Sequence, residues 1–268
     1  PIYGTGQGSG NSPQLWNFVC STLFDAYEKR ATGACFASYD STLLEKLYMT
    51  GYVDDCCQRI NDFTAFPQPT SEEIIDRMQH DAQWWHDLLW ASGGALEISK
   101  CSFHLIKSQW TSNGVPFLAP NAADKTLRLN SINGPIEVPQ MSNYKSHKTL
   151  GHFVNPSGSM TSQLQRLIVQ STQFASWIQA NILTQSETAT MYHSIYVPSI
   201  TYTLCNTNLT PTECQQIDVI IHQTAVPRCG YNRCMATPVR YAPRSFGGAG
   251  FRDTYTEQTV ATTLQALK

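Results

Sequence analysis

Two adjacent aspartates, Asp54 and Asp55, are the residues of this chain whose type and spacing best fit metal chemistry. They follow Tyr52, and short apolar runs at 47–53 and 56–60 flank the acidic pair. This pattern predicts a β-hairpin with the pair at its turn. Neighbouring carboxylates repel each other, and a divalent cation such as Mg²⁺ relieves that repulsion while also binding phosphate oxygens. Such a pair can support two-metal phosphoryl transfer.

The acidic string alone leaves a second interpretation open, because adjacent aspartates often lie in solvated turns that bind no metal. Three further motifs accompany it in the sequence. Residues 7–13 read QGSGNSP, residues 93–101 read GGALEISKC, and residues 149–152 read TLGH. In type and order, the four strings resemble the motifs of the reverse transcriptase family, especially the enzymes of non-LTR-type retroelements. The resemblance covers about residues 1–155.

The resemblance implies a role for each matching residue. Asp54 and Asp55 would bind two catalytic Mg²⁺ ions, with Mn²⁺ as an alternative metal, and Asp54 would be the more critical ligand. Lys100 would stabilise or protonate the leaving pyrophosphate. The residues expected to contact substrates are Gln7, Gly8, Tyr52 and Val53 for the nucleotide and template, and Leu150 and Gly151 for the primer.

The implied activity is RNA-directed DNA polymerisation by the protein of a retrotransposon, with an RNA template, a DNA primer and dNTP substrates. The family's third metal-binding aspartate and its fingers would be encoded before Pro1. We therefore expect the chain to be a fragment that is inactive by itself. The lifestyle of such elements implies an intracellular protein, acting on a chromosome in the nucleus or assembled in the cytoplasm.

Two alternatives remain. An RNA-templated RNA polymerase shares the same acidic hairpin, although Val53 before the pair suits reverse transcriptases and glycine is commoner in RNA polymerases. A decayed element would leave a non-catalytic nucleic-acid-binding remnant. The intact Gln7, Asp54, Asp55 and Lys100 argue against long decay.

The charge is distributed unevenly along the chain. Residues 1–140 carry nine Lys/Arg and fifteen Asp/Glu (9 − 15 = −6), and residues 141–268 carry nine and five (9 − 5 = +4). No carboxylate occurs between Asp218 and Asp253, a segment that includes five arginines. The arginines that we expect to contact a nucleic-acid backbone are Arg228, Arg233, Arg240, Arg244 and Arg252. Tyr231, Tyr241, Phe246 and Phe251 lie among them, a mixture that suits phosphate contact and base stacking. A solvated cationic loop region would have the same composition.

The elements around these motifs indicate an α/β (α+β) fold. Apolar spacing predicts helices at 12–30 and 71–92, short strands within 96–118 and 134–154, and mostly helices after about 160. The resemblance implies a partial right-hand polymerase palm at 1–155, with an antiparallel sheet and packed helices. A helical thumb-like region would follow at 156–268. No apolar run reaches the length of about 20 residues that spans a bilayer, and the nine irregularly spaced cysteines predict free thiols.

Overall fold

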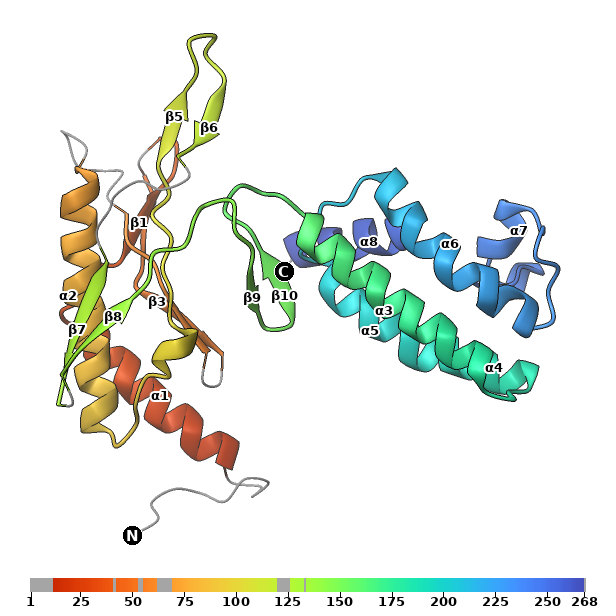
Figure 1. The fold of residues 1–268 in the computed structure, drawn as a ribbon, viewed down its shortest axis with the longest axis horizontal. Coiled ribbons are helices and arrows are strands. Elements are labelled where there is room, and N and C mark those ends of the chain that lie inside the picture. The colour runs from red at the N-terminus through yellow and green to blue at the C-terminus, as the bar shows by residue number, and fades with distance from the viewer. Residues whose placement is uncertain are drawn as a thin grey trace. The chain divides into compact units, whose positions relative to one another are not determined.

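The chain folds into two compact units, Pro1–Asn143 and Tyr144–Lys268. A computed structural model describes residues 12–40, 42–52, 55–61, 69–119, 126–132 and 134–267, with the backbone alone for residues 12, 13 and 52. Figure 1 shows a first unit that mixes helices with β-hairpins and a second unit that is mostly helical. The mixed α/β class expected from the sequence is therefore confirmed.

The first unit pairs its strands as separate antiparallel hairpins, β1–β2, β3–β4, β5–β6 and β7–β8. Its elements are α1 (Ser12–Glu28), β1 (Ala34–Ala37), β2 (Leu44–Leu47), β3 (Met49–Tyr52), β4 (Asp55–Gln58), α2 (Ser71–Ala91), the 3₁₀ helix η1 (Ile98–Lys100), β5 (Ser108–Trp110), β6 (Pro116–Leu118), β7 (Leu127–Ser131) and β8 (Gly134–Val138). Within the described ranges, the expected antiparallel sheet is thus a set of two-stranded ribbons.

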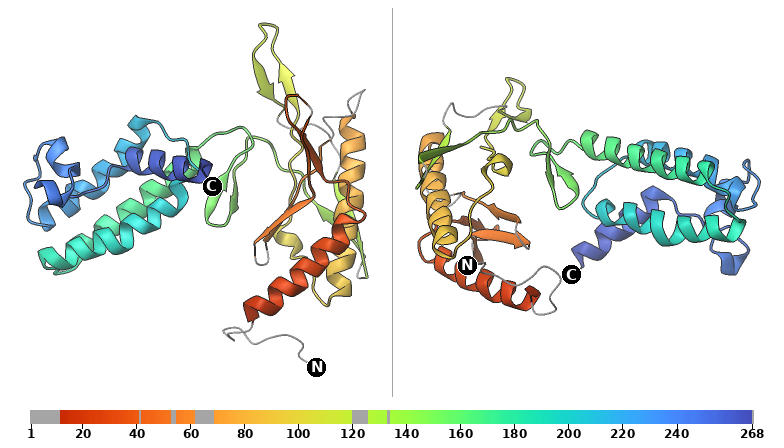
Figure 2. Two further views of the ribbon diagram at one scale, coloured as in Figure 1. Left: turned by 180° about the vertical axis from the view of Figure 1, so that it is seen from behind. Right: turned by 60° about the horizontal axis from the view of Figure 1, so that its bottom comes forward.

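Helix α2 organises the first unit. It begins with a capping box, in which Glu73 N–H donates to Thr70 Oγ1 and Thr70 N–H donates to the Glu73 carboxylate at 2.7 Å. Its apolar face packs on α1 and β7 (Figure 2). Gln79 and Gln83 also exchange hydrogen bonds with the backbone of Arg128 and Asn130 in β7. One helix turn separates the two glutamines, so they satisfy the edge of β7 as a neighbouring strand would.

The second unit buries its core between helices. Its elements are β9 (His147–Thr149), β10 (His152–Val154), α3 (Thr161–Ala180), α4 (Gln185–Met191), the π-helical η2 (Tyr192–Tyr196), α5 (Val197–Leu204), α6 (Pro211–Arg228), α7 (Thr237–Tyr241), the 3₁₀ helix η3 (Arg244–Phe246) and α8 (Thr254–Ala266). Helices α3 and α6 pack most extensively, with Leu167, Ile178, Ile217 and Ile221 fully buried. The π turn immediately precedes α5, which has Pro198 in its first turn and therefore lacks one backbone donor there.

The sequence predicted most helices and fewer of the strands. The helices expected at 12–30, at 71–92 and after about 160 are confirmed, and α6 begins with a capping box at Thr210. The segment 96–107 forms a 3₁₀ turn and irregular structure where strands were expected, and β7 was not predicted. The units divide after Asn143, whereas the sequence placed a boundary near 155. The β9–β10 hairpin therefore belongs with the helices, because β10 packs on α3.

The nine cysteines all lie within the described residues, and no disulfide joins any of them. This confirms the expectation that the chain has no disulfide framework. Among the described helices, none is both long and apolar enough to cross a membrane.

A glycine-rich turn closes the segment between α7 and α8. Gly248 N–H donates to Pro243 O, Ala249 N–H donates to Val239 O, and Phe251 N–H donates to Arg240 O. Ala249 and Phe251 are thereby buried in the core of the second unit. A Cβ atom on Gly248 would lie 2.0 Å from the backbone oxygen of Ala242, so this position accepts only glycine without a backbone shift.

We expect Gly248→Ala to destabilise the second unit by about 3 kcal/mol, because the added methyl group overlaps a backbone carbonyl. Gly247→Ala is the matched control. Gly247 has a φ of 77° but open space around its Cβ position, so its substitution should cost only about 1 kcal/mol of left-handed strain. Urea denaturation followed by far-ultraviolet circular dichroism measures both. Equal losses in the two variants would contradict the close approach at Gly248.

Candidate functional site

The β3–β4 hairpin carries the acidic residues singled out by the sequence. Its register pairs Met49 with Gln58 and Tyr52 with Asp55. The predicted hairpin is confirmed, but Asp55 is the first residue of β4 and not a turn residue. Its side chain is exposed, and no hydrogen bond or ion pair engages it within the described residues. The carboxylate oxygens of Asp55 are therefore open to a cation or to water.

Helix α1 supports this hairpin from behind through an aromatic side chain. A Cβ atom on Gly51 would lie 2.5 Å from Cζ of Phe24, so the ring occupies the space that a larger residue in β3 would need. Phe24 in turn packs on Trp85 of α2, with ring centroids 5.7 Å apart. Gly51 therefore lets β3 approach the two helices closely.

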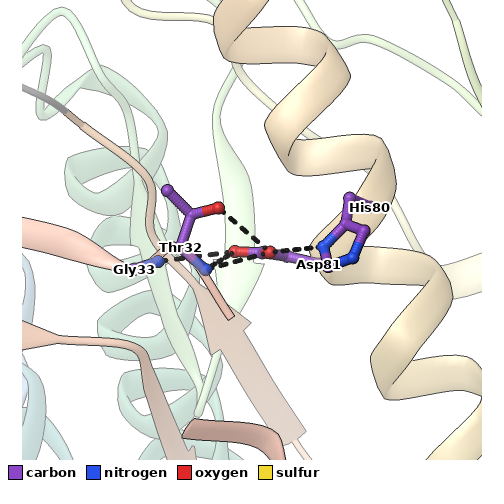
Figure 3. A network of polar contacts seen from close by, with 4 residues as sticks. All are labelled: Thr32, Gly33, His80 and Asp81. Atoms are coloured by element: carbon purple, nitrogen blue, oxygen red, sulfur yellow. Dashed lines mark hydrogen bonds and ion pairs between the residues drawn. The ribbon is translucent and has the colours of Figure 1, made fainter. Parts of the chain in front are cut away.

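A buried carboxylate fixes the start of β1 on α2 (Figure 3). Asp81 is fully buried and accepts hydrogen bonds from Thr32 N–H (2.8 and 3.0 Å), Thr32 Oγ1 (3.3 Å) and Gly33 N–H (3.4 Å). His80 Nδ1 lies 3.3 Å from the same carboxylate. The next link is Asn61, whose Oδ1 accepts from Cys35 N–H at 2.7 Å. This chain of contacts joins α2 to β1 and β1 to the segment that follows β4.

Asp81 was not identified from the sequence, although a signal was present. It lies between Met78 and Ala82 on the face of α2 that packs in the core, where a lone acidic residue must have hydrogen-bond partners. All of its hydrogen bonds are to residues of the first unit, so we assign Asp81 the role of positioning the hairpins.

Lys100 is the last residue of η1, and its side chain is exposed. Figures 1 and 2 show η1 beside the end of the β3–β4 hairpin within the first unit. No hydrogen bond or ion pair joins Lys100 to Asp55 in the described residues. Its charge lies close enough to Glu97 to help lower the pKa of that carboxyl, after the larger effect of hydrogen bonds from Ser99.

Several expected site residues lie outside the described residues. These are Gln7, Gly8, Val53 and Asp54, and Tyr52 is described by its backbone alone. Within the described ranges, no three His, Cys, Asp or Glu side chains gather closely enough to hold a metal ion. Because Asp54 lies outside those ranges, this finding does not test the expected Mg²⁺ site.

Leu150 and Gly151, the expected primer-binding residues, form the tip of the β9–β10 hairpin in the second unit. Leu150 has a φ of 49° and Gly151 a φ of 77°. A left-handed backbone costs a leucine about 1–2 kcal/mol, and strained residues of this kind often occur at functional positions. The hydroxyl of Tyr202 in α5 donates to the Leu150 carbonyl at 3.1 Å and helps hold the tip.

Four of the five expected nucleic-acid arginines make hydrogen bonds inside the second unit. Within the described residues, Arg233 makes none and is fully available to a ligand. The internal contacts are Arg228 to Gln179 O (3.2 Å), Arg240 to Met235 O (3.3 Å), Arg244 to Ala249 O and His193 Nε2 (3.4 Å each), and Arg252 to Glu257 (3.1 Å). These arginines therefore contribute to the fold of their segment, whether or not they also contact phosphate.

The aromatic residues of this segment belong mostly to the core. Phe251 is 3% exposed and packs on Tyr192, with ring centroids 4.9 Å apart, while Tyr231 and Tyr241 are half-buried against the same cluster. Phe246, at 84% exposed, is free to stack on a base. The alternation of arginine and aromatic residues thus reflects a folded turn more than a stacking surface.

A groove of about 610 Å³ borders the π-helical turn, with His193, Arg244, Arg252, Asp253 and Glu257 in its lining. Burial, with the charges of the two arginines, lowers the pKa of His193, so its imidazole is neutral at pH 7. The two carboxylates then balance the two guanidinium groups. The groove consequently has no excess positive charge with which to attract phosphate.

Buried polar contacts tie the arginine-rich segment to the helices. Tyr192 Oη accepts from Arg252 N–H and lies within hydrogen-bond distance of His222 Nε2, both at 3.1 Å. Asp218 accepts from Thr254 Oγ1 (2.6 Å) and Thr254 N–H (3.2 Å) at the start of α8. Burial raises the pKa of Asp218 to about 7 and lowers the pKa of His222 to about 4.

No known family model matches the chain, and no curated protein is significantly similar to it. The resemblance in the four short motifs therefore remains a basis for a proposal about function.

We expect Asp81→Asn to destabilise the first unit by about 3 kcal/mol, because an amide offers one acceptor where the carboxylate offers two to the same backbone donors. Asp87→Asn, on the exposed face of α2, should change stability by less than about 0.5 kcal/mol. Urea denaturation followed by tryptophan fluorescence reports mainly on this unit, which contains five of the six tryptophans. A loss in Asp81→Asn no greater than in Asp87→Asn would contradict the positioning role.

The second unit should lose stability as the pH rises from 6.5 to 8. The raised pKa of Asp218 means that its stabilising contribution is complete below its ordinary value of 3.8 and is lost as the pH rises through about 7. His222 has a lowered pKa, so its contribution is present above 6.5 and is lost only as the pH falls toward 4. Between pH 6.5 and 8, Asp218 is therefore the one of these two groups that titrates in the folded state.

Hydrogen exchange of α6 and α8, corrected for the intrinsic effect of pH, measures this loss of stability. Asp218→Asn should abolish the loss, because the amide does not titrate. Glu213→Gln, at the exposed start of α6, should retain it, because hydrogen bonds from Thr210 lower the pKa of Glu213 out of the tested range. The same loss of protection in Asp218→Asn as in the unsubstituted chain would rule out this assignment.

Proposed function

We propose that this chain is the palm and thumb-like portion of an RNA-directed DNA polymerase from a retroelement. The observation that carries the proposal is the β3–β4 hairpin, in which Tyr52 pairs with Asp55 and only residues 53 and 54 join the strands. A two-residue connection keeps Asp54 and Asp55 together at one end of a hairpin. The motif order from QGSGNSP to TLGH supports the same assignment.

The residues of the hairpin fit a divalent metal. Asp55 has an exposed carboxylate that no cationic side chain engages within the described residues, and Asp54 precedes it directly. When bound, Mg²⁺ would supply positive charge near the primer 3′-hydroxyl and the triphosphate. Asp54 and Asp55 would hold the metal, Tyr52 and Val53 would lie near the primer terminus, and Lys100 would offset negative charge on the leaving pyrophosphate.

The surrounding elements suit a rigid support for that chemistry. Asp81, Phe24 and Asn61 brace β1 and the β3–β4 hairpin against α1 and α2, and sites on braced strands keep their geometry better than sites on loops. In the second unit, Leu150 and Gly151 would contact the primer, and Arg233 with the exposed Arg228 would contact the nucleic-acid backbone.

None of the four motif strings contains the family's third metal-binding aspartate. Loss of a metal ligand costs several kcal/mol of transition-state stabilisation, so the chain as given should not extend a primer detectably.

Primer extension on an RNA template tests the function. The chain joined to its encoded upstream sequence should synthesise DNA in the presence of Mg²⁺, and the same protein with Asp54→Asn and Asp55→Asn should lose at least about a thousandfold of that activity. The chain alone should be inactive, and activity of the chain alone that Asp55→Asn abolishes would show that no upstream ligand is needed.

The longer protein with Asp87→Asn is the matched control, since Asp87 lies exposed on α2 and changes charge by the same amount. Synthesis from ribonucleotides in preference to deoxynucleotides would favour an RNA-templated RNA polymerase. A folded protein that binds primer–template and makes no product would favour a non-catalytic nucleic-acid-binding remnant.

A further inference from the structure

Arg166 is the one charged residue among the twenty residues of α3. Its guanidinium group lies against the tip of the β9–β10 hairpin, where a Cβ atom on Gly151 would be 3.7 Å from Nη2 and 3.8 Å from Nη1. The same Cβ atom would lie 3.8 Å from the Tyr202 ring. The hairpin tip, α3 and α5 therefore meet around this guanidinium, and the missing side chain of Gly151 leaves space beside it.

Three polar atoms at this junction are buried and lack a hydrogen-bond partner within the described residues: Arg166 Nη1, Gln163 Nε2 and His152 Nδ1. Gln163 is fully buried, and its Oε1 accepts from Phe153 N–H at 3.0 Å. His152 is 8% exposed, and burial together with the charge of Arg166 lowers its pKa. Two of the three atoms can only donate, so an oxygen-rich acceptor would complete the junction.

Within the described residues, no carboxylate supplies that acceptor. From Tyr144 to Thr212 the only acidic residue in the sequence is Glu187, and its carboxylate accepts from Thr184 N–H at 2.8 Å in a capping box. Arg166 forms no ion pair within the described residues. Its positive charge is therefore uncompensated, which is unusual for a side chain with a buried guanidinium nitrogen.

We propose that Arg166, beside the Leu150–Gly151 turn, binds a phosphate group of a nucleic-acid strand. A guanidinium matches phosphate oxygens with two parallel hydrogen bonds, whereas a lysine offers a point charge. Nη2 is not buried as Nη1 is, so it is the nitrogen that first meets an incoming phosphate. The ligand class rests on the proposed function, and Arg166 adds to it a residue that none of the four motifs contains.

Binding of a labelled RNA–DNA hybrid by the full chain, measured by fluorescence anisotropy over a series of NaCl concentrations, tests this role. Arg166→Gln should weaken binding roughly fivefold to tenfold at about 0.1 M salt and reduce the log–log salt slope by about one, since one phosphate contact is lost. Arg166→Lys should keep most of the slope with intermediate affinity, because it keeps the charge and loses the paired donors.

Arg128→Gln is the matched control, because it removes the same charge from an exposed arginine that already pairs with Glu137 at 3.1 Å in the first unit. It should leave the slope unchanged. Thermal melting of each variant separates binding from folding. An unchanged slope in Arg166→Gln overturns the proposal, including the case in which that variant melts early, because Arg166 then acts only inside the fold.

Absence of hybrid binding by the unsubstituted chain overturns the proposal as well. The two proposals can fail independently. Primer extension tests the acidic hairpin, whereas the salt slope requires no catalysis. In a further outcome, millimolar inorganic phosphate displaces the hybrid while Arg166→Gln keeps the salt slope of the unsubstituted chain. That outcome would identify a site for free anions and would count against a nucleic-acid contact.

Discussion

The carboxylate of Asp81 lies fully buried on α2, and the backbone N–H groups of Thr32 and Gly33 converge on it. A buried charge is tolerated only where such donors replace water, so the start of β1 must stay at this point on the helix. The position of the β3–β4 hairpin depends on that of β1. Asn61 ties the segment after β4 to β1, and Phe24 fills the space left by Gly51 in β3. The exposed Asp55 thus stands on a hairpin that is held by both helices.

In the second unit, a different set of buried polar groups fixes the position of a helix. Asp218 accepts two hydrogen bonds from Thr254 at the start of α8, and Gln258 of α8 hydrogen-bonds both backbone groups of Leu209. These contacts hold the C-terminal helix on the core. The arginine-rich segment at 228–252 is held in place partly by its own arginines, because four of them donate hydrogen bonds to nearby acceptors. Positive charge in a sequence is therefore a weaker guide to a nucleic-acid surface than positive charge that the fold leaves without a partner.

That distinction separates the two basic regions of the second unit. Around His193, Arg252 pairs with Glu257, and the lining of the groove holds as many carboxylates as guanidinium groups. Around Arg166, buried donors lack an acceptor among the described residues. The physical argument for a ligand is stronger at the second region, although it contains fewer charges, because an unsatisfied buried donor gains more from a phosphate than a solvated one does.

The sequence by itself determined the helices and the acidic hairpin, because these depend on local periodicity, capping residues and turn chemistry. The capping box at Thr210 and the two apolar runs around Asp54 and Asp55 are signals of that kind. Tertiary structure alone decided the rest. It revealed β7 through side chains of α2 that bind its edge, placed the β9–β10 hairpin with the helices, and buried Phe251 in the core. It also set Arg166 against Gly151, fifteen residues away in the sequence (166 − 151 = 15). Contacts between such distant positions depend on packing in three dimensions, which the local pattern of a single sequence does not encode.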